Sequence, residues 1–104
     1  MKFGLADDDL NWIIQRISSF TEIDKVILFG SRAKENYKRG SDIDIAIYGQ
    51  KIDFHVVSHL QALLQEQSHM PYMVDVVDGT HLTHEALREH IDRVGQVIYV
   101  RSIQ

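Results

Sequence analysis

Two short groups of residues near the middle of this chain have the types and spacing for phosphate and metal chemistry. Gly30 and Ser31 follow an apolar run, and after ten intervening residues come Asp42 and Asp44, on either side of an isoleucine. A glycine and a serine in a turn present backbone amides and a hydroxyl that can meet phosphate oxygens. Carboxylates at positions i and i+2 of a strand share one face and suit a hard cation such as Mg²⁺. Together the two groups predict nucleotide chemistry.

Neither group is distinctive by itself, and the prediction depends on their combination. A glycine after a strand is usually a turn, and alternating aspartate and isoleucine is ordinary for a half-buried strand with a wet face. Two aspartates side by side on one strand face repel each other, however, and threonine would serve a merely solvated face better. A bound divalent cation would remove that repulsion.

The predicted secondary structure brings the two groups to one end of a pair of strands. The continuous apolar run 26–29 stops at a glycine, which is the pattern of a buried strand. Residues 41–48 alternate between isoleucines on one face and an acidic second face, which predicts another strand. A helical turn over residues 31–34, with its first free amides near the glycine, and a basic loop connect the two strands. The glycine–serine turn can therefore lie beside the aspartates.

The remaining segments complete a single domain over residues 1–104, which the length of the chain favours. Apolar periodicity predicts helices over residues 7–20 and 53–67 and a last helix ending near Gly95, a third strand over residues 73–77, and a terminal strand or extended tail over residues 97–100. The candidate N-caps of the three helices are Asp7, Asp8 or Asp9 for the first, Asp53 for the second and Thr83 for the last.

The composition is that of a soluble globular protein and limits the classes of partner. Of the 104 residues, 44% are hydrophobic, 25% are charged and none is cysteine, so disulfides and thiolate metal sites are excluded. The formal charge of −4 argues against general nucleic-acid binding, and no direct stable DNA binding is expected. Residues 30–41 nevertheless hold four basic side chains against one acidic, which suits a local phosphate receptor. With no signal peptide or membrane-length apolar run, we expect a cytoplasmic protein without membrane contact.

A third carboxylate and two basic side chains extend the candidate site. Asp75 lies in the predicted third strand among apolar residues, where a carboxylate is costly without a partner. Asp78 is the rival, but its position before a glycine is explained by a turn. Arg32 and Lys34 lie in the basic loop, where they either contact phosphate or are solvated charges.

The histidines predict no second site. His55 and His59 have the i, i+4 spacing of a helical metal pair, but the sequence offers no third ligand, so we expect an exposed helix face. No constellation includes the remaining histidines, which are His69, His81, His84 and His90. Tyr72 belongs either to a partner surface or to ordinary packing.

The combined pattern resembles the polymerase-beta-like nucleotidyltransferase superfamily. The resemblance is carried by the runs Phe29-Gly-Ser-Arg-Ala-Lys and Gly40-Ser-Asp-Ile-Asp-Ile-Ala-Ile and by the later strand residue Asp75, and it covers about residues 10–100. In particular the chain resembles the minimal nucleotidyltransferases (MNT), which are similar to antitoxin partners of HEPN-domain toxins. Glu35 departs from the pattern, because many relatives have glycine there; the change would stiffen the loop or weaken phosphate binding.

The resemblance implies an α/β (α+β) nucleotidyltransferase fold, a small mixed β-sheet flanked by helices. Its nucleotide-binding residues would be Gly30, Ser31, Arg32 and Lys34, and its catalytic and metal-binding residues Asp42, Asp44 and Asp75. The first group would hold the triphosphate of ATP and the second would hold Mg²⁺. Asp75 would complete the metal site or accept the proton of the acceptor hydroxyl.

The resemblance also implies a function, that of an Mg²⁺-dependent protein adenylyltransferase. As an antitoxin it would transfer AMP from ATP to a tyrosine of a HEPN RNase toxin and so neutralise it. Larger members add a domain that grips the acceptor, whereas the catalytic unit uses nearly all of these 104 residues, so we expect a partner to supply the acceptor. Two alternatives remain, a non-catalytic antitoxin that occludes the toxin and nucleotidyl transfer to a small-molecule hydroxyl.

Overall fold

Helices and strands follow one another along the chain largely as the hydrophobic pattern predicts. The computed structural model describes residues 2–38, 40–66 and 70–102. In chain order the elements are α1 (Asp7–Ser18), β1 (Lys25–Phe29), α2 (Ser31–Lys34), β2 (Ile43–Tyr48), α3 (Phe54–Glu66), β3 (Val74–Asp78), α4 (Glu85–Val94) and β4 (Gln96–Val100). None of the helices in these described ranges is long and apolar enough to cross a membrane.

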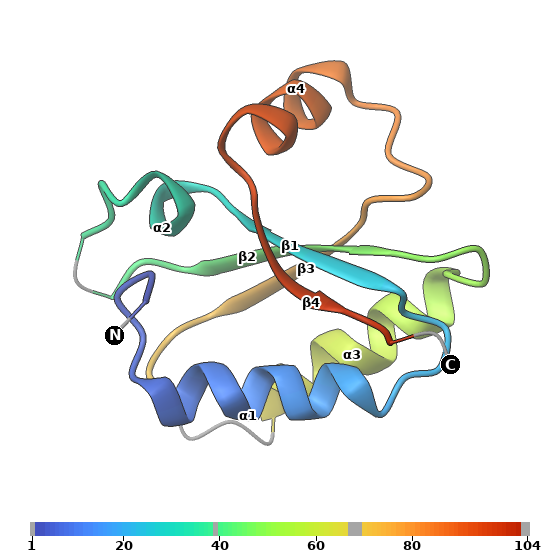
Figure 1. Cartoon of the computed structure of the whole chain (residues 1–104), viewed down its shortest axis with the longest axis horizontal. Coiled ribbons are helices and arrows are strands. Elements are labelled where there is room, and N and C mark those ends of the chain that lie inside the picture. Colours follow the sequence, from blue (N-terminus) through green and yellow to red (C-terminus); the bar gives the residue numbers. More distant parts are fainter. Residues whose placement is uncertain (1, 39, 67–69, 103–104) are drawn as a thin grey trace.

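A mixed four-stranded sheet in the order β3–β2–β1–β4 forms the centre of the fold (Figure 1). β1 is antiparallel to both of its neighbours, β2 and β4, whereas β2 and β3 are parallel. The parallel pair needs a crossover, and α3 supplies it between β2 and β3. The small mixed sheet flanked by helices confirms the predicted fold class, and the last segment is a strand rather than an extended tail.

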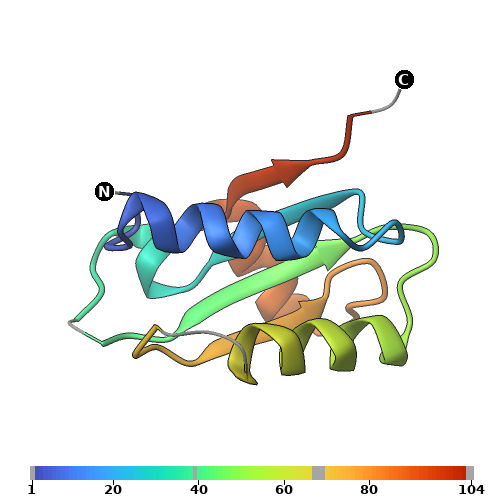
Figure 2. The ribbon, with the colours of Figure 1, turned by 90° about the horizontal axis from the view of Figure 1, so that it is seen from below.

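The helices cover the two faces of the sheet unequally. α1 and α3 lie side by side across one face, and α4 lies on the other (Figures 1 and 2). The first face carries the main core, to which β2 contributes Ile43, Ile45 and Ile47, all fully buried. The second face carries a smaller cluster around Phe29, Ala46 and Ile91. α4 adds Ile91 and Leu87 to that cluster, and the part of the second face that includes Asp44 of β2 and Asp75 of β3 is left for polar side chains.

The helix starts differ from two of the three predicted N-caps. Ala6 is the N-cap of α1, and its side chain makes no capping hydrogen bond. The three aspartates at positions 7–9 lie in the first turn instead, where their negative charges interact favourably with the helix dipole. For α4 the N-cap is His84, whose ring accepts a hydrogen bond from the Leu87 amide, so the prediction of Thr83 is wrong. A neutral imidazole nitrogen can accept a hydrogen bond from a backbone amide as a hydroxyl oxygen does, so a histidine can replace threonine in this role.

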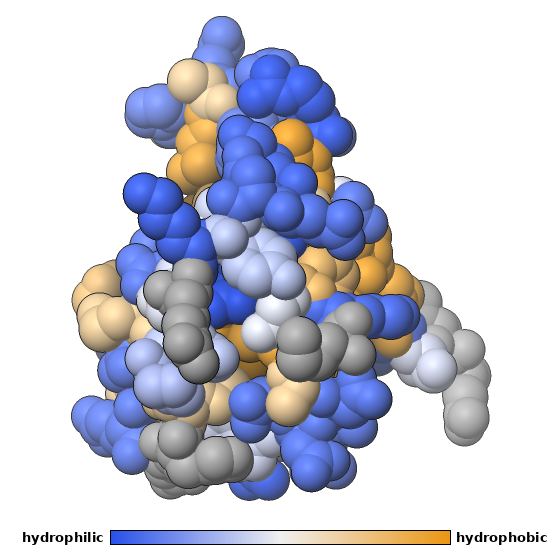
Figure 3. Space-filling model, turned by 90° about the vertical axis from the view of Figure 1, so that its left-hand side faces the viewer, coloured by the Kyte–Doolittle hydropathy of each residue, from blue (hydrophilic) through white to orange (hydrophobic). Residues whose placement is uncertain are grey.

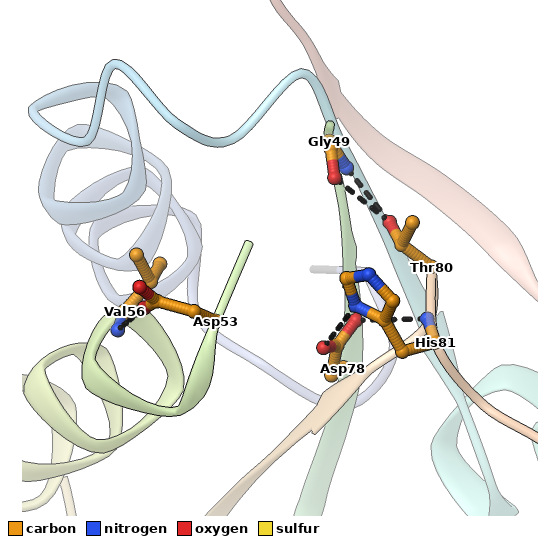
Figure 4. Close-up of polar contacts among 6 residues, drawn as sticks. All are labelled: Gly49, Asp53, Val56, Asp78, Thr80 and His81. Atoms are coloured by element: carbon orange, nitrogen blue, oxygen red, sulfur yellow. Dashed lines mark hydrogen bonds and ion pairs between the residues drawn. The ribbon is translucent and has the colours of Figure 1, made fainter. Parts of the chain in front are cut away.

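Asp53 and Asp78 have the local roles that the sequence predicts (Figure 4). The carboxylate of Asp53 accepts a hydrogen bond from the Val56 amide at 3.0 Å and so caps the start of α3. Asp78 ends β3 and turns towards His81, accepting its backbone amide at 3.1 Å and lying 2.7 Å from its ring nitrogen. These contacts fix the turn after β3, which supports Asp75 over Asp78 as the candidate site residue.

Candidate nucleotide and metal site

Strand pairing brings the predicted site residues together at one end of the sheet. Asp44 of β2 is paired with Phe29 of β1, the residue before Gly30. On its other side Asp44 is paired with Asp75 of β3. Because paired residues on adjacent strands project from the same face, the two carboxylates lie next to each other and beside the turn that follows β1. Asp42 lies just before β2 and is exposed.

Gly30 is required by both its backbone conformation and its neighbour. Its φ of 77° and ψ of −158° lie in a region of backbone conformation that is essentially confined to glycine. A Cβ atom added there would collide with the Oδ2 atom of Asp44. The absence of a side chain at Gly30 therefore lets the carboxylate of Asp44 lie directly against the turn.

Burial and like charge act together on Asp44. Burial raises the pKa of its carboxyl above the ordinary value of 3.8, and the charges of Asp75 and then Asp42 raise it further. The nearby ring of His90, when it is protonated, has the weaker, opposite effect on this pKa. A carboxylate that is crowded by two others gains most from a bound cation, so the electrostatics fit a divalent metal ion.

The carboxylates do not form a complete metal cage by themselves. Across the residues that the structure describes, no three His, Cys, Asp or Glu side chains are close enough together to hold a metal ion. Mg²⁺ is nevertheless usually held by one or two carboxylates together with substrate phosphates and water, rather than by protein ligands alone. Asp44 and its neighbours fit that kind of partial site, and their three-ligand assignment stays a prediction.

Arg32 holds the loop that carries the site. Its side chain is only 2% exposed, and its guanidinium donates hydrogen bonds to the carbonyls of Ser41, at 2.7 and 3.0 Å, and Phe3, at 2.8 Å. The rings of Tyr37 and Tyr72 lie 5.3 and 4.4 Å from its central carbon. One guanidinium therefore ties α2 to the N-terminal segment, to the residue before Asp42 and to the segment before β3.

These contacts correct the predicted role of Arg32. A guanidinium that is buried between two rings and bound to two carbonyls holds the chain in place instead of facing a ligand, so we replace the predicted phosphate contact by a positioning role. Tyr72 packs on this cation, which favours ordinary packing over a partner surface, the two roles that the sequence left open for this residue. The charge pattern of the loop gave no sign of burial, because the carbonyls that satisfy Arg32 come from distant parts of the chain.

The other loop residues are more accessible. Ser31 starts α2 and is half-buried, Lys34 is exposed at its end, and Glu35 follows in a left-handed conformation with φ of 62°. Hydrophilic residues cover most of this side of the molecule, with hydrophobic ones visible beneath α4 at the top (Figure 3). Lys34 and Ser31 thus remain available to a polar ligand, and their predicted phosphate contacts stay predictions.

His90 also lies at the site, although it was not among the predicted site residues. The backbone amide of Gly30 donates a hydrogen bond to the Nε2 atom of this residue at 3.2 Å. The two residues are 60 positions apart, and α4 brings them together by packing against β1. Helical spacing places His90 next to the apolar position Ile91, but no sequence signal indicates which loop such a neighbour meets.

The helical histidines lie elsewhere. His55 and His59 are both exposed, as predicted, and the ring of His59 packs edge-on against Phe20 with 5.0 Å between centroids. They line a cavity of about 430 Å³ at the end of α1 and the start of α3, which none of the candidate site residues lines. His69 falls outside the described residues.

Comparisons with known proteins identify the family. The family model described as polymerase beta, nucleotidyltransferase matches residues 11–104, and the chain belongs to this family. A comparison with curated proteins finds no match. The family membership agrees with a site built from a glycine–serine turn and strand carboxylates.

Similar solved structures share the fold. A crystal structure of a toxin–antitoxin with AMP-PNP contains a chain that is 21% identical at a TM-score of 0.71, with 94% of this chain and 76% of that chain covered. The toxin–antitoxin MntA-HepT gives 21% identity and a TM-score of 0.70, covering 92% and 74%. The structure of a tri-AMPylated Shewanella oneidensis HEPN toxin in complex with MNT antitoxin contains a chain that is 22% identical at a TM-score of 0.66. The match covers 89% of this chain and 71% of that chain.

The buried position of Arg32 predicts a large loss of stability on replacement. Arg32→Lys retains a charge but cannot reach both carbonyls in the same plane, so it should lower the free energy of unfolding by about 2–3 kcal/mol, since hydrogen bonds to charged groups contribute about 1.5–3 kcal/mol each. Lys34→Met, on the exposed end of the same helix, is the control and should change it by less than about 0.5 kcal/mol. Urea unfolding measures both, and equal losses would contradict the positioning role.

Gly30 and Gly40 both have a positive φ, but only at Gly30 would an added Cβ atom meet Asp44. Gly40 has a φ of 81° and open space around an added Cβ, so Gly40→Ala should cost only the strain of about 1–2 kcal/mol. Gly30→Ala combines the collision with the carboxylate and a φ, ψ pair that is essentially confined to glycine, so it should cost distinctly more. Urea unfolding of the two variants makes the comparison, and an equal cost would mean that the close approach of Asp44 is unimportant.

The raised pKa of Asp44 predicts an unusual pH dependence. The pKa of Asp44 in the folded protein exceeds the unfolded value of 3.8, so the folded state favours the protonated carboxyl. The stability that this carboxyl contributes is therefore fully present below pH 3.8 and is lost as the pH rises through the folded pKa. Without Mg²⁺, Asp44→Asn should therefore be more stable than the wild-type protein at pH 7, and this advantage should shrink as the pH falls towards 3.8. Urea unfolding of both proteins across this pH range measures the difference in their free energies of unfolding. A variant that is less stable than the wild-type protein at pH 7 would contradict the prediction.

Proposed function

We propose that this protein is an antitoxin that transfers AMP from Mg²⁺-bound ATP to a tyrosine hydroxyl of a cognate HEPN toxin. The observation that carries the proposal is the approach of Asp44 to the Gly30 turn with Asp75 beside it on the next strand. A phosphate-binding turn and acidic metal ligands must share one space for nucleotidyl transfer, because the metal ion and the protein act on the same phosphate oxygens.

The donor half of the reaction follows from the residues around the turn. The amide of Gly30 and the hydroxyl of Ser31 bind the triphosphate, with Lys34 as an exposed positive charge nearby. Asp42 and Asp44 hold Mg²⁺, and Asp75 either completes that site or takes up a proton. When bound, Mg²⁺ neutralises the charge on the phosphate oxygens and aligns them. Arg32 contributes by holding Ser41 and with it the start of the strand that carries the aspartates.

The transfer step needs little covalent chemistry from the protein. The tyrosine oxygen forms a bond to the α-phosphorus of ATP, the bond from that phosphorus to the oxygen bridging the β-phosphate breaks, and pyrophosphate leaves. The tyrosine proton goes to a carboxylate. Asp75 is the suitable acceptor if it is not a metal ligand, since its side chain is exposed and can be reached by an incoming hydroxyl, whereas Asp44 is half-buried.

The choice of acceptor is supported by the similar structures. One of them contains a tri-AMPylated HEPN toxin in complex with MNT antitoxin, and another is a toxin–antitoxin with AMP-PNP, an ATP analogue. A toxin modified by AMP is the product that the donor half of this site would make. Family membership supports the transfer chemistry, and these complexes support the toxin as its target.

Transfer of label from α-labelled ATP to the cognate HEPN toxin tests the proposal. With Mg²⁺ the wild-type protein should label the toxin and relieve its toxicity, and Asp42→Asn or Asp44→Asn should reduce labelling at least about 100-fold, as expected when charge stabilisation of a phosphoryl transition state is lost. Removing Mg²⁺ with a chelator should have the same effect.

Asp78→Asn is the matched control, because this aspartate ends the same strand as Asp75 but serves the turn with His81. It should retain labelling. Relief of toxicity without label on the toxin would overturn the transfer reaction. If relief also persists unchanged in Asp42→Asn and Asp44→Asn, the protein neutralises its partner by occlusion. Label on a small-molecule hydroxyl and not on the toxin would indicate the other alternative.

A further inference from the structure

The amide that the proposed function offers to phosphate is already occupied in this structure. The N–H of Gly30 points at the Nε2 atom of His90, with 3.2 Å between the nitrogens. The imidazole is braced by Phe29, whose ring meets it nearly edge-on, with 6.1 Å between centroids and 82° between planes. His90 is half-buried.

This contact has a definite chemical requirement. Nε2 can accept the hydrogen bond only through its lone pair, so the ring is neutral and carries its proton on Nδ1. A backbone amide has a single hydrogen, and a phosphate oxygen that takes this hydrogen must displace the imidazole. The imidazole nitrogen therefore occupies the place of a phosphate oxygen at Gly30.

We propose that His90 is a nucleotide-site residue that holds the Gly30 amide while no nucleotide is bound and releases it when phosphate arrives. The inference rests on the proposed function, since it takes the triphosphate as the ligand of this turn. An anionic phosphate oxygen is a stronger acceptor than a neutral imidazole nitrogen, because charge-assisted hydrogen bonds are about twice as strong as neutral ones. Phosphate can thus replace the imidazole, whereas a neutral ligand gains nothing by doing so.

The packing of α4 makes such a release local. Ile91, adjacent to His90, is 2% exposed and anchors the helix in the smaller hydrophobic cluster, with Leu87 packed against the same cluster. The anchor is separate from the imidazole, which touches the turn from the edge of the cluster. A change of side-chain rotamer at His90 therefore frees the amide without moving the helix from the sheet.

The consequence for binding is opposite to that of an ordinary ligand residue. Nucleotide binding must first break the contact between Gly30 and His90, so the contact weakens the observed affinity. Removing the imidazole should tighten ATP binding about two- to tenfold, which corresponds to the typical net contribution of one hydrogen bond. A residue that bound phosphate directly, or one that merely supported the fold of the site, would weaken binding when removed.

Calorimetric titration of the toxin-free protein with ATP and Mg²⁺ tests the inference. His90→Ala should lower the Kd about two- to tenfold relative to the wild-type protein, and the Gly30 amide should exchange faster with solvent in the nucleotide-free variant. Glu89→Gln, at the neighbouring exposed position of α4, is the matched control and should leave the Kd unchanged. If His90→Ala does not fold, His90→Leu keeps an apolar contact with Phe29 and lacks the acceptor, and the same decrease is expected.

The outcomes separate this inference from the proposed function. Wild-type binding of ATP together with an unchanged or higher Kd in the folded His90 variant overturns the role of His90 and leaves the nucleotide site intact. No binding of ATP by the wild-type protein, the Glu89 control and the His90 variant overturns both. Binding by the His90 variant alone would be the strongest form of the expected result.

Discussion

Asp44 and Asp75 occupy paired positions on parallel neighbouring strands, so their negative charges repel across a half-buried face of the sheet. Much of the surrounding structure serves to keep them there. The isoleucines of β2 on the opposite face are fully buried, and a shift of one residue in register would exchange them with the aspartates, so the core fixes where the carboxylates point. Gly30 completes the arrangement, because only a residue without a side chain leaves room for Asp44.

Two long-range hydrogen-bonding residues connect this charged face to the rest of the molecule, and they do so in different ways. Arg32 is buried and ties three segments around the site together, so it determines the shape of the loop whether or not a ligand is present. His90 packs on Phe29 at the edge of the smaller cluster and accepts a hydrogen bond from the Gly30 amide, which we propose it gives up to phosphate. The site thus combines a rigid frame with one exchangeable contact at the amide of Gly30.

Local signals predicted the elements well and their ends less well. The alternation of residues 41–48 and the apolar run 26–29 gave both central strands, because burial on one face or on two leaves a direct trace in the sequence. The cap of α3 at Asp53 was likewise evident, whereas α1 begins after Ala6 and α4 after His84. Several neighbouring residues can cap a helix, and the choice depends on where the chain enters from the preceding loop.

The sequence by itself determined the residue types of the site and the strands that carry them: a glycine–serine turn after β1, alternating aspartates on β2 and an isolated aspartate on β3. It determined them because strand periodicity and the choice of residue are local properties. Only the tertiary structure decided that Asp75 lies beside Asp44, that Arg32 is buried and that His90 meets the Gly30 amide. These three facts depend on strand order and on the packing of α4, which join residues far apart in the chain and leave no periodic trace along it.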